Sequence, residues 1–172
     1  MSKKNIILTG PPKSGKTTLV ENLIDPFTNK QGFLTKEVVE KDRGRVGFEA
    51  VAADGKRTII AHVNIKSPYR VGKYGVDIKA LEKILSGLFD FQDGDLLYID
   101  EIGQMELFSS VFKKLVLKYL NSPNLFIATL TRTYSDKFTR MIKKRNDMLI
   151  FKLAPEKREH VYNKIENLLR NG

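Results

Sequence analysis

The sequence predicts an α/β fold in which helices cover both faces of a central parallel sheet, with an inserted antiparallel β-meander near residues 32–62. Strand and helix patterns alternate along most of the chain. Several strand patterns are continuous apolar runs, as expected for strands buried on both faces. The chain has 172 residues and carries no linker or internal repeat, which suits a single domain spanning residues 1–172.

The first third of the chain predicts one strand, one helix and the meander. Residues 6–9 are a short apolar run that ends at a glycine. Residues 17–24 repeat apolar side chains at helical spacing until Asp25-Pro26, because a residue before proline leaves the helical region. Turn residues at 42–45 and 54–55 separate the strands of the meander. These strands are predicted at residues 32–39, 46–52 and 57–62.

The rest of the chain alternates helices and strands after an irregular stretch at residues 63–76. Asp77 is the predicted cap of the next helix, Ser135 caps a short helix, and Pro155 suits the first position of the last helix. The helices are predicted at residues 77–89, 108–120, 135–142 and 155–169, and the strands at 96–99, 125–130 and 148–153.

Composition excludes several classes of function. Thirty Lys and Arg residues against 20 Asp and Glu give a net charge of +10, which favours an anionic partner such as a nucleotide or a nucleic acid. Cysteine is absent, which excludes disulfides, thiol catalysis and cysteine-ligated zinc. The two histidines, His62 and His160, lie far apart in the sequence and do not favour a metal cage or a Ser-His-Asp triad.

The N-terminus predicts no membrane segment. The stretch from Met1 to Leu8 starts like a signal peptide, but its apolar part is too short and a Gly-Pro-Pro sequence ends it. Nowhere does an apolar run approach the ~20 residues of a membrane helix. We therefore expect a cytoplasmic protein that does not cross a membrane.

The segment Gly10–Thr17 matches the phosphate-binding motif G-x-x-x-x-G-K-[ST] at every fixed position, between a predicted strand and a predicted helix. Gly10 and Gly15 allow the loop to curl, so that backbone N–H groups point at phosphate oxygens. The N-terminus of the following helix adds a partial positive charge. We expect Lys16 to reach the β- and γ-phosphates and the Thr17 hydroxyl to ligate Mg²⁺.

Two acids, Asp100 and Glu101, follow the apolar run at residues 96–99. Carboxylates at the carboxyl end of a parallel strand lie in the crevice where such sheets bind ligands. Asp100 suits the acid that holds Mg²⁺ opposite a phosphate loop. Glu101 is able to orient a water molecule or accept its proton, which favours hydrolysis of the terminal phosphate.

We expect the strand at residues 125–130 to lie between the strand before the phosphate loop and the strand that carries the acids. Polar residues at its end, Thr129, Thr131 and Arg132, are then candidates to touch the γ-phosphate or the water. The sequence equally allows ordinary loop roles for them.

Four segments carry a resemblance to a known family: residues 9–19, 32–38, 69–76 and, most specifically, Ile99–Ser109. Over nearly its whole length the chain is similar to a family of small P-loop nucleoside-triphosphatases, sometimes called the cancer-related NTPase family. The resemblance implies a RecA-like sheet and slow, Mg²⁺-dependent hydrolysis of ATP, GTP and other nucleoside triphosphates with broad base tolerance. Two residues depart from the family pattern: Lys13 replaces a loop glycine, and Gln104 replaces a lysine.

These arguments give one candidate site. Lys16 and Glu101 are the predicted catalytic residues, and Thr17 and Asp100 the predicted ligands of Mg²⁺. The predicted nucleotide-binding residues are Gly10, Pro11, Pro12, Lys13, Ser14, Gly15, Lys16, Thr17, Thr18, Asp100, Glu101 and Gly103.

Alternatives remain open at this point. The basic segment 132–145 suits the lid of a nucleotide, nucleoside or polynucleotide kinase, a nucleic-acid-binding face or a plain solvated surface. Arg70 and Lys73, in the irregular stretch, are candidates to neutralise the triphosphate, directly or from a neighbouring subunit. A dedicated GTPase switch is excluded, because Asn29-Lys30-Gln31-Gly32 lacks the aspartate of the guanine motif and lies too early. The oligomeric state is not predicted.

Overall fold

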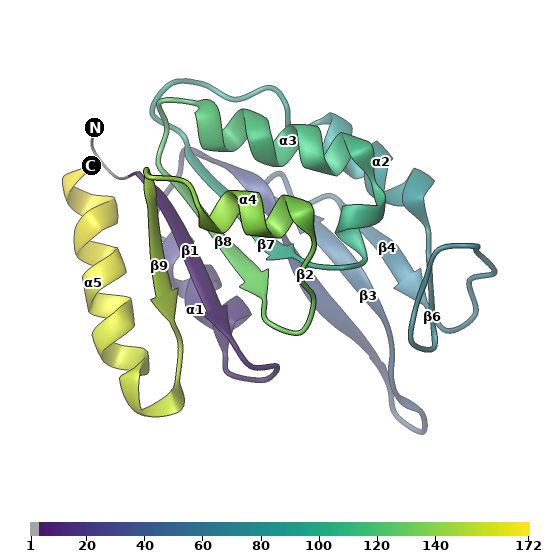
Figure 1. Ribbon diagram of the computed structural model, residues 1–172. Helices are drawn as coiled ribbons and strands as arrows, with labels where there is room; N and C mark the ends of the chain where they lie inside the picture. The colour runs from purple at the N-terminus through teal and green to yellow at the C-terminus, as the bar shows by residue number, and fades with distance from the viewer. Residues whose placement is uncertain (1–3) are drawn as a thin grey trace.

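A single nine-stranded sheet organises the computed structural model, which describes residues 4–172 (Figure 1). The strand order is β5-β6-β4-β3-β2-β7-β8-β1-β9. The bounds are β1 Asn5–Gly10, β2 Lys30–Glu40, β3 Gly44–Ala52, β4 Arg57–His62, β5 Arg70–Val71, β6 Tyr74–Val76, β7 Leu96–Ile102, β8 Phe126–Thr131 and β9 Met148–Lys152. Residues 1–3, part of the N-terminal stretch considered above, lie outside the description.

The sheet has a parallel half and an antiparallel half that share β2. Strands β2, β7, β8, β1 and β9 run parallel to their neighbours, whereas β3, β4, β6 and β5 continue from β2 in antiparallel pairs. The predicted central parallel sheet is therefore confirmed. Strand β8 lies between β1 and β7, as expected for the strand at residues 125–130.

The antiparallel meander is part of the main sheet. Its first strand, β2, pairs in parallel with β7 through Lys30 to Phe33, so the meander extends the central sheet at one side. The prediction that residues 63–76 are irregular is wrong for the end of this stretch, where β5 and β6 form a short hairpin that pairs with β4. Two- and three-residue strands are too short to leave a periodic pattern in the sequence.

Five α-helices of the described chain cover the sheet, three on one face and two on the other (Figure 1). Helices α2, α3 and α4 pack on a cluster that includes Leu81, Phe112 and Ile142, and helices α1 and α5 pack on a cluster that includes Leu19 and Ile165. The bounds are α1 Lys16–Ile24, α2 Ile78–Ser86, α3 Ser110–Asn121, α4 Lys137–Lys143 and α5 Arg158–Asn171. Short 3₁₀ turns at Glu106–Phe108 and Pro155–Lys157 precede α3 and α5.

Helix caps explain where these helices begin. The Asp77 side chain accepts a hydrogen bond from the Ala80 N–H at 2.9 Å, as predicted. Helix α4 begins one residue later than expected, because Asp136 caps it instead of Ser135. The Asp136 carboxylate accepts from the Thr139 N–H, and the Asp136 N–H donates to the Thr139 hydroxyl. This reciprocal capping box satisfies two backbone donors.

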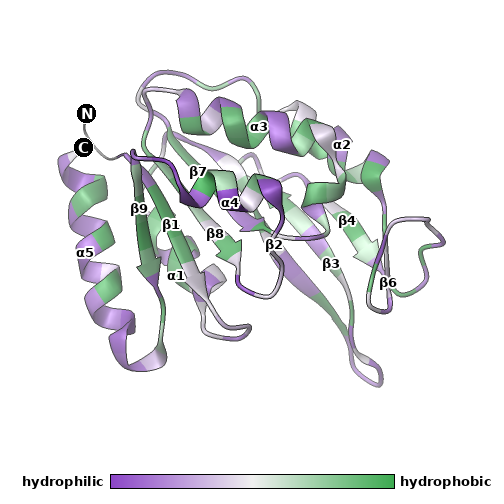
Figure 2. Cartoon of the chain, viewed as in Figure 1, coloured by the Kyte–Doolittle hydropathy of each residue, from purple (hydrophilic) through white to green (hydrophobic). Residues whose placement is uncertain are grey.

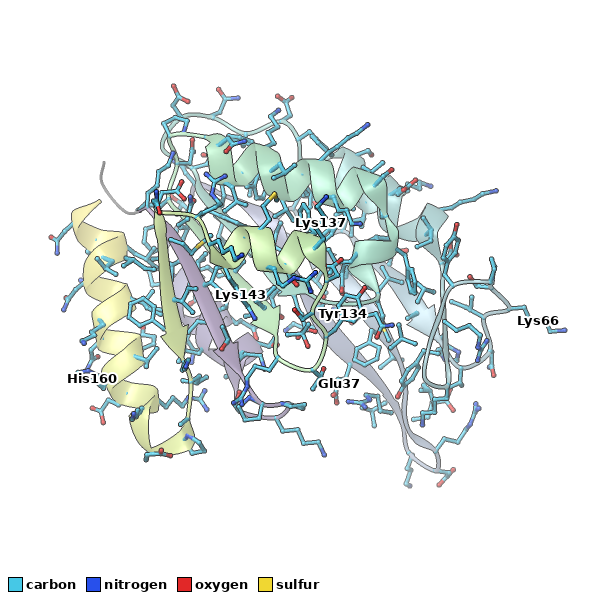
Figure 3. The ribbon with its side chains drawn as sticks, viewed as in Figure 1. Glu37, Lys66, Tyr134, Lys137, Lys143 and His160 are labelled. Carbon is cyan, nitrogen blue, oxygen red and sulfur yellow. The ribbon has the colours of Figure 1, made fainter. Side chains whose placement is uncertain are left out.

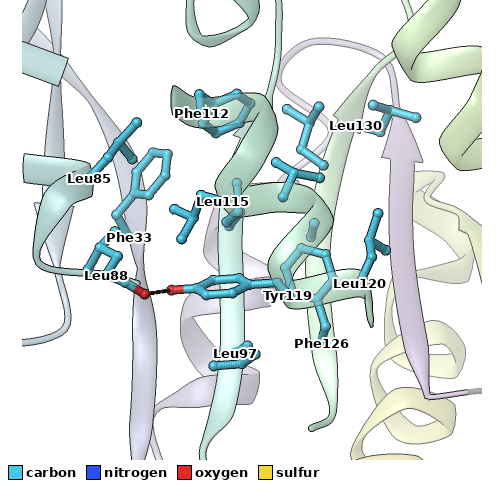
Figure 4. Close-up of a cluster of buried hydrophobic side chains, with 14 of the residues drawn as sticks. Phe33, Leu85, Leu88, Leu97, Phe112, Leu115, Tyr119, Leu120, Phe126 and Leu130 are labelled. Atoms are coloured by element: carbon cyan, nitrogen blue, oxygen red, sulfur yellow. Dashed lines mark hydrogen bonds between the residues drawn. The ribbon is translucent and has the colours of Figure 1, made fainter. Parts of the chain in front are cut away.

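The core follows the apolar strands. Figure 2 shows that β1 and β7 are mainly hydrophobic, while helix α5 alternates hydrophobic and hydrophilic residues. In the larger cluster the buried Tyr119 ring packs edge-on to Phe126, and its hydroxyl donates to the Leu88 carbonyl at 2.8 Å (Figure 4). That bond matters because a buried hydroxyl without a partner costs roughly 1–3 kcal/mol. No helix in residues 4–172 is long and apolar enough to cross a membrane.

Candidate active site

The phosphate-binding motif forms the loop between β1 and α1, at the carboxyl end of the parallel strands. Gly15 is the N-cap of α1 with φ 85°, a left-handed conformation that favours glycine. Lys16 is 9% exposed, and its ammonium group donates 3.0 Å hydrogen bonds to the carbonyls of Gly10 and Pro11. The lysine is thus held inside the loop, at the position that phosphate oxygens would approach.

Close packing restricts the first position of the loop to glycine. A Cβ atom at Gly10 would lie 2.7 Å from Ser14 Oγ and 3.0 Å from the Leu153 carbonyl oxygen. Lys13 has φ 61° and is the one residue other than glycine with a positive φ in residues 4–172. This conformation gives a physical reason why glycine is favoured where the chain carries Lys13.

Asp100 lies at the end of β7, opposite the phosphate loop, and is 1% exposed. Its Oδ1 accepts a 2.6 Å hydrogen bond from the Thr129 hydroxyl on β8, whereas its Oδ2 is buried without a hydrogen-bond partner in the described chain. Burial raises the pKa of Asp100, and the neighbouring Thr129, Thr17, Thr35 N–H and Lys16 act in the opposite direction. A buried carboxylate oxygen without a partner, beside Thr17 and Lys16, fits a site for a hydrated Mg²⁺ ion.

An irregularity in strand pairing positions the acids. Ile99 pairs with Ala128 and Ile102 with Leu130, so β7 has one more residue than β8 across this interval. Such a bulge redirects the side chains of the strand. Glu101 is mostly buried, and burial together with the neighbouring charge of Asp100 raises its pKa, which Lys16 opposes. A carboxylate with a raised pKa is better suited to take a proton near neutral pH.

A third acid, Glu106, belongs to the same cluster and was not predicted. It begins the 3₁₀ turn before α3 and is 3% exposed. A Cβ atom at Gly103 would lie 2.6 Å from Glu101 Oε1 and 3.0 Å from Glu106 Oε2, so the two carboxyl groups meet beside that glycine. Burial, and then the charge of Glu101, raises the pKa of Glu106 to about 8. Glu106 stands in the segment that resembles the family, but nothing in the local pattern distinguishes a buried acid from an exposed one.

One cleft of about 860 Å³ brings most of the predicted residues together. It is bounded by the phosphate loop, the end of β7, the meander and the start of the β8–α4 connection. Glu37 lines it from the meander, and Tyr134 lines it from the β8–α4 connection; Figure 3 labels both. The predicted residues that line it are Gly10, Pro12, Lys13, Gly15, Lys16, Thr17, Thr18, Asp100, Glu101, Gln104, Thr131 and Arg132.

Other predicted residues lie behind or beside the lining. Ser14 is buried in the loop, Pro11 is exposed and contributes its carbonyl to Lys16, and Gly103 is buried beneath the two glutamates. The Thr129 hydroxyl donates its hydrogen bond to Asp100, and Thr129 does not line the cleft. Direct roles of these residues in nucleotide binding stay predictions.

Arg70 and Lys73 do not line the cleft, although Val71 between them does. Both are exposed, and the Arg70 guanidinium donates to the Lys73 carbonyl at 3.0 Å. The Lys73 ammonium lies 5.5 Å from the centre of the Tyr74 ring. Within one chain, the structure thus gives these two cations no contact with the phosphate loop.

The basic segment 132–145 divides into two parts. Arg132 lines the cleft, whereas Arg145 forms an ion pair with Asp147 at 2.7 Å and is structural. Helix α4 is anchored on the core through buried Thr139 and Ile142. A second, open depression of about 380 Å³ lies along this helix, lined by Lys137, Arg140, Met141, Lys144 and Arg145.

Comparisons with known proteins agree over almost the whole chain. The model of a family described as NTPase matches residues 5–166. A nucleoside-triphosphatase THEP1 of Thermotoga sp. strain RQ2 is 42% identical over 167 residues, which cover 96% of this chain and 95% of that protein. The human cancer-related nucleoside-triphosphatase is 32% identical and covers 92% of both chains. The crystal structure of THEP1 from Aquifex aeolicus superposes with a TM-score of 0.86 at 31% identity, covering 96% of this chain and 98% of the other. The chain therefore belongs to the NTPase family, a family of nucleoside-triphosphatases.

Proposed function

We propose that this chain hydrolyses the bond to the terminal phosphate of nucleoside triphosphates, including ATP and GTP, in a Mg²⁺-dependent reaction with broad tolerance of the base. One observation carries the proposal. The buried Asp100 and the partly buried Glu101 line the same cleft as Lys16, and one Asp100 oxygen has no hydrogen-bond partner in residues 4–172. The names of the family's members support the same reaction class.

The phosphate loop binds the triphosphate. Backbone N–H groups of the loop and of the first turn of α1 donate to the phosphate oxygens, and the partial positive charge of the helix N-terminus adds to their attraction. Lys16 exchanges its carbonyl partners, Gly10 and Pro11, for phosphate oxygens and stabilises the charge that spreads over them during transfer. Because phosphoryl transfer needs placement and charge more than covalent help, these contacts supply much of the rate.

Thr17 and Asp100 would hold Mg²⁺, with Thr129 orienting the Asp100 carboxylate from behind. When bound, the ion neutralises charge on the β- and γ-phosphate oxygens. Lys16 acts against the rise in the pKa of Asp100 that burial causes.

Glu101 holds the attacking water and receives its proton. The water oxygen forms a bond to the γ-phosphorus, and the bond from that phosphorus to the β–γ bridging oxygen breaks. The proton that the water loses passes to the Glu101 carboxylate, whose raised pKa suits this role. The products are a nucleoside diphosphate and phosphate.

The test is Glu101→Gln. It keeps the side chain's shape, so we expect unchanged nucleotide affinity and a loss of turnover of about 10²–10⁴-fold, the usual contribution of a positioned base. Glu21→Gln, in the same cleft but paired with Lys36, is the matched control and should stay near wild-type turnover. Lys16→Ala should lose affinity and turnover together. Near-normal turnover by Glu101→Gln would assign the base elsewhere.

Kinase activity is the rival reaction of the same site. The assay is direct: radiolabelled γ-phosphate from ATP is followed to water or to a nucleoside, nucleotide or polynucleotide acceptor. Phosphorylated acceptor as the main product would replace hydrolysis.

A second candidate function, nucleic-acid binding, is favoured by the α4 depression. Four cationic side chains line it, and Lys137, Arg140 and Lys144 make no ion pair in the described chain. Phosphate backbones bind such surfaces with strong salt dependence. We expect single-stranded RNA to bind weakly, with the affinity falling as salt rises and in the double variant Lys137→Ala, Lys144→Ala. If that variant binds RNA as tightly as the wild type, α4 is not part of the interface. If RNA does not change the rate of hydrolysis, RNA binding is not coupled to the reaction.

We propose that the chain acts as one domain in the cytoplasm. The single continuous sheet through the described residues supports the one-domain organisation. The supply of nucleoside triphosphates in the cytoplasm supports the cytoplasmic location, which cell fractionation tests.

A further inference from the structure

Arg158, the first residue of α5, packs against the phosphate loop. A Cβ atom added at Gly15 would lie 2.7 Å from Arg158 Nη1 and 3.2 Å from its Cζ, so the guanidinium group lies beside this glycine, with Nη1 nearest to it. The side chain is half-buried and does not line the cleft described above. Arg158 follows β9, which lies on the other side of β1 from β8 and β7, the strands of Thr129 and Asp100.

The Arg158 guanidinium makes no hydrogen bond or ion pair in residues 4–172, although it contacts the protein. Most other arginines on this molecule are paired with carboxylates; these are Arg43, Arg45, Arg57, Arg145 and Arg170. A guanidinium has five donors and two planar faces, and it is weakly hydrated. Held in place but unpaired, the Arg158 group is prepared to contact a ligand.

The strand order tells which end of a nucleotide would reach Arg158. The terminal phosphate belongs beside Asp100 on β7, and the order β7-β8-β1-β9 puts β9 on the other side of the loop. The triphosphate therefore runs from β7 across the loop, and its nucleoside end lies over the β9–α5 connection. This connection is fastened to the loop, since the Leu153 N–H donates to the Thr9 carbonyl at 2.7 Å. Figure 1 shows both connections at the same edge of the sheet.

We infer that the Arg158 guanidinium is the platform on which the base of the bound nucleotide stacks. The inference rests on the proposed function and names the residue that holds the nucleoside end. Every base has a π-face, and arginine attracts aromatic faces through its charge and its planarity. Stacking against one face reads no hydrogen-bonding edge of the base. This arrangement would account for the proposed tolerance of different bases.

The test compares ligands with and without a base. Calorimetry with Mg²⁺ gives the affinities of ADP, GDP, CDP, UDP and inorganic pyrophosphate, none of which requires turnover. For Arg158→Ala we expect the affinities of all four diphosphates to fall about 5- to 150-fold, as stacking energies of ~1–3 kcal/mol per base predict, and that of pyrophosphate to stay within about twofold. Lys157→Ala, which removes a neighbouring exposed cation, is the control and should change none of them.

Two further variants keep the inference open to refutation. Arg158→Lys retains the charge but not the plane, so we expect it to weaken the diphosphates nearly as much as Arg158→Ala. A parallel loss of pyrophosphate affinity, or full rescue by lysine, would make Arg158 a phosphate contact and overturn the platform. Phe48 is an aromatic residue that lines the cleft. Unchanged diphosphate affinity in Arg158→Ala with a loss in Phe48→Ala would place the base inside the cleft. A failure of hydrolysis in the wild-type chain would overturn the proposed function and leave these affinities to be measured independently.

Discussion

The Thr129 hydroxyl donates a 2.6 Å hydrogen bond to one oxygen of the Asp100 carboxylate, and the other oxygen has no hydrogen-bond partner among residues 4–172. The two residues lie on adjacent parallel strands, β8 and β7, and both are buried. The bond fixes the orientation of the carboxylate and so decides which of its oxygens is available to a cation. Groups that orient a metal ligand in this way contribute strongly to metal affinity.

Thr129→Val should therefore weaken the proposed Mg²⁺ site without removing a ligand. The valine has nearly the same shape but no hydroxyl, so we expect the Mg²⁺ concentration for half-maximal hydrolysis to rise about 10- to 100-fold. We also expect a loss of about 1–2 kcal/mol in the free energy of unfolding, because Asp100 Oδ1 loses its donor. Thr129→Ser keeps the hydroxyl and should preserve the Mg²⁺ requirement; equal behaviour of the two variants would deny the bond its role.

Lys13→Gly tests the positive φ at this position. Lysine at φ 61° costs roughly 1–2 kcal/mol relative to its usual conformations, whereas glycine tolerates it. Glycine also adds backbone entropy to the unfolded chain, which opposes part of the gain. We expect the free energy of unfolding to stay equal or to rise by up to about 1 kcal/mol.

Lys114→Gly is the matched control for Lys13→Gly, because Lys114 is exposed inside helix α3. There the same substitution should cost about 1 kcal/mol. Urea denaturation of both variants gives the comparison, and equal destabilisation would show that the loop stores no strain at Lys13.

The pKa of Glu106, raised to about 8 from an ordinary value of 4.5, predicts a dependence of stability on pH. Between these values the folded chain keeps a proton that the unfolded chain releases, so the free energy of unfolding falls as the pH rises from about 4.5 to about 8. Glu101 and Asp100, the charged groups that raise this pKa besides burial, act in the same direction. Glu106→Gln removes the contribution of this one group.

Denaturation at several pH values without metal measures the effect. We expect Glu106→Gln to gain stability relative to the wild type on going from pH 5 to pH 9, by an amount on the order of a few kcal/mol. Glu159→Gln, on the exposed first turn of α5, should show no such gain. A constant difference between wild type and Glu106→Gln across this range would show that Glu106 is ionised in the folded chain.

The sequence predicts those parts of the site that are local. The phosphate loop and the acids at the end of β7 each occupy a short segment whose residue types have a direct chemical reason, and their neighbours fix strand and helix on either side. The central strands were also predictable, because burial on both faces requires continuous apolar runs.

The contacts that the sequence did not predict are those that the fold makes between segments far apart in the chain. Glu106 belongs to the site only because the fold buries it beside Glu101. Arg158 reaches Gly15 only because β9 pairs with β1 and brings α5 there. Thr129 was a candidate for direct contact with phosphate, but it contacts Asp100, since its side chain points along the sheet to β7. None of these contacts leaves a periodic pattern.

Gly103 provides the sharpest test of the acidic cluster. Gly103→Ala would bring a methyl group to 2.6 Å from Glu101 Oε1 and 3.0 Å from Glu106 Oε2, closer than unbonded atoms approach. The Glu101 side chain must then move, and misplacement of a reacting group by about 1 Å costs on the order of 10²-fold in rate. We expect kcat to fall by this factor with little change in nucleotide affinity, because the phosphate loop is untouched. Gly87→Ala, at φ −77° with its nearest neighbour 3.9 Å away, introduces the same methyl group where it fits and should leave kcat unchanged. If Gly103→Ala also keeps its kcat, the position of Glu101 does not limit the reaction, and the water is held by other groups.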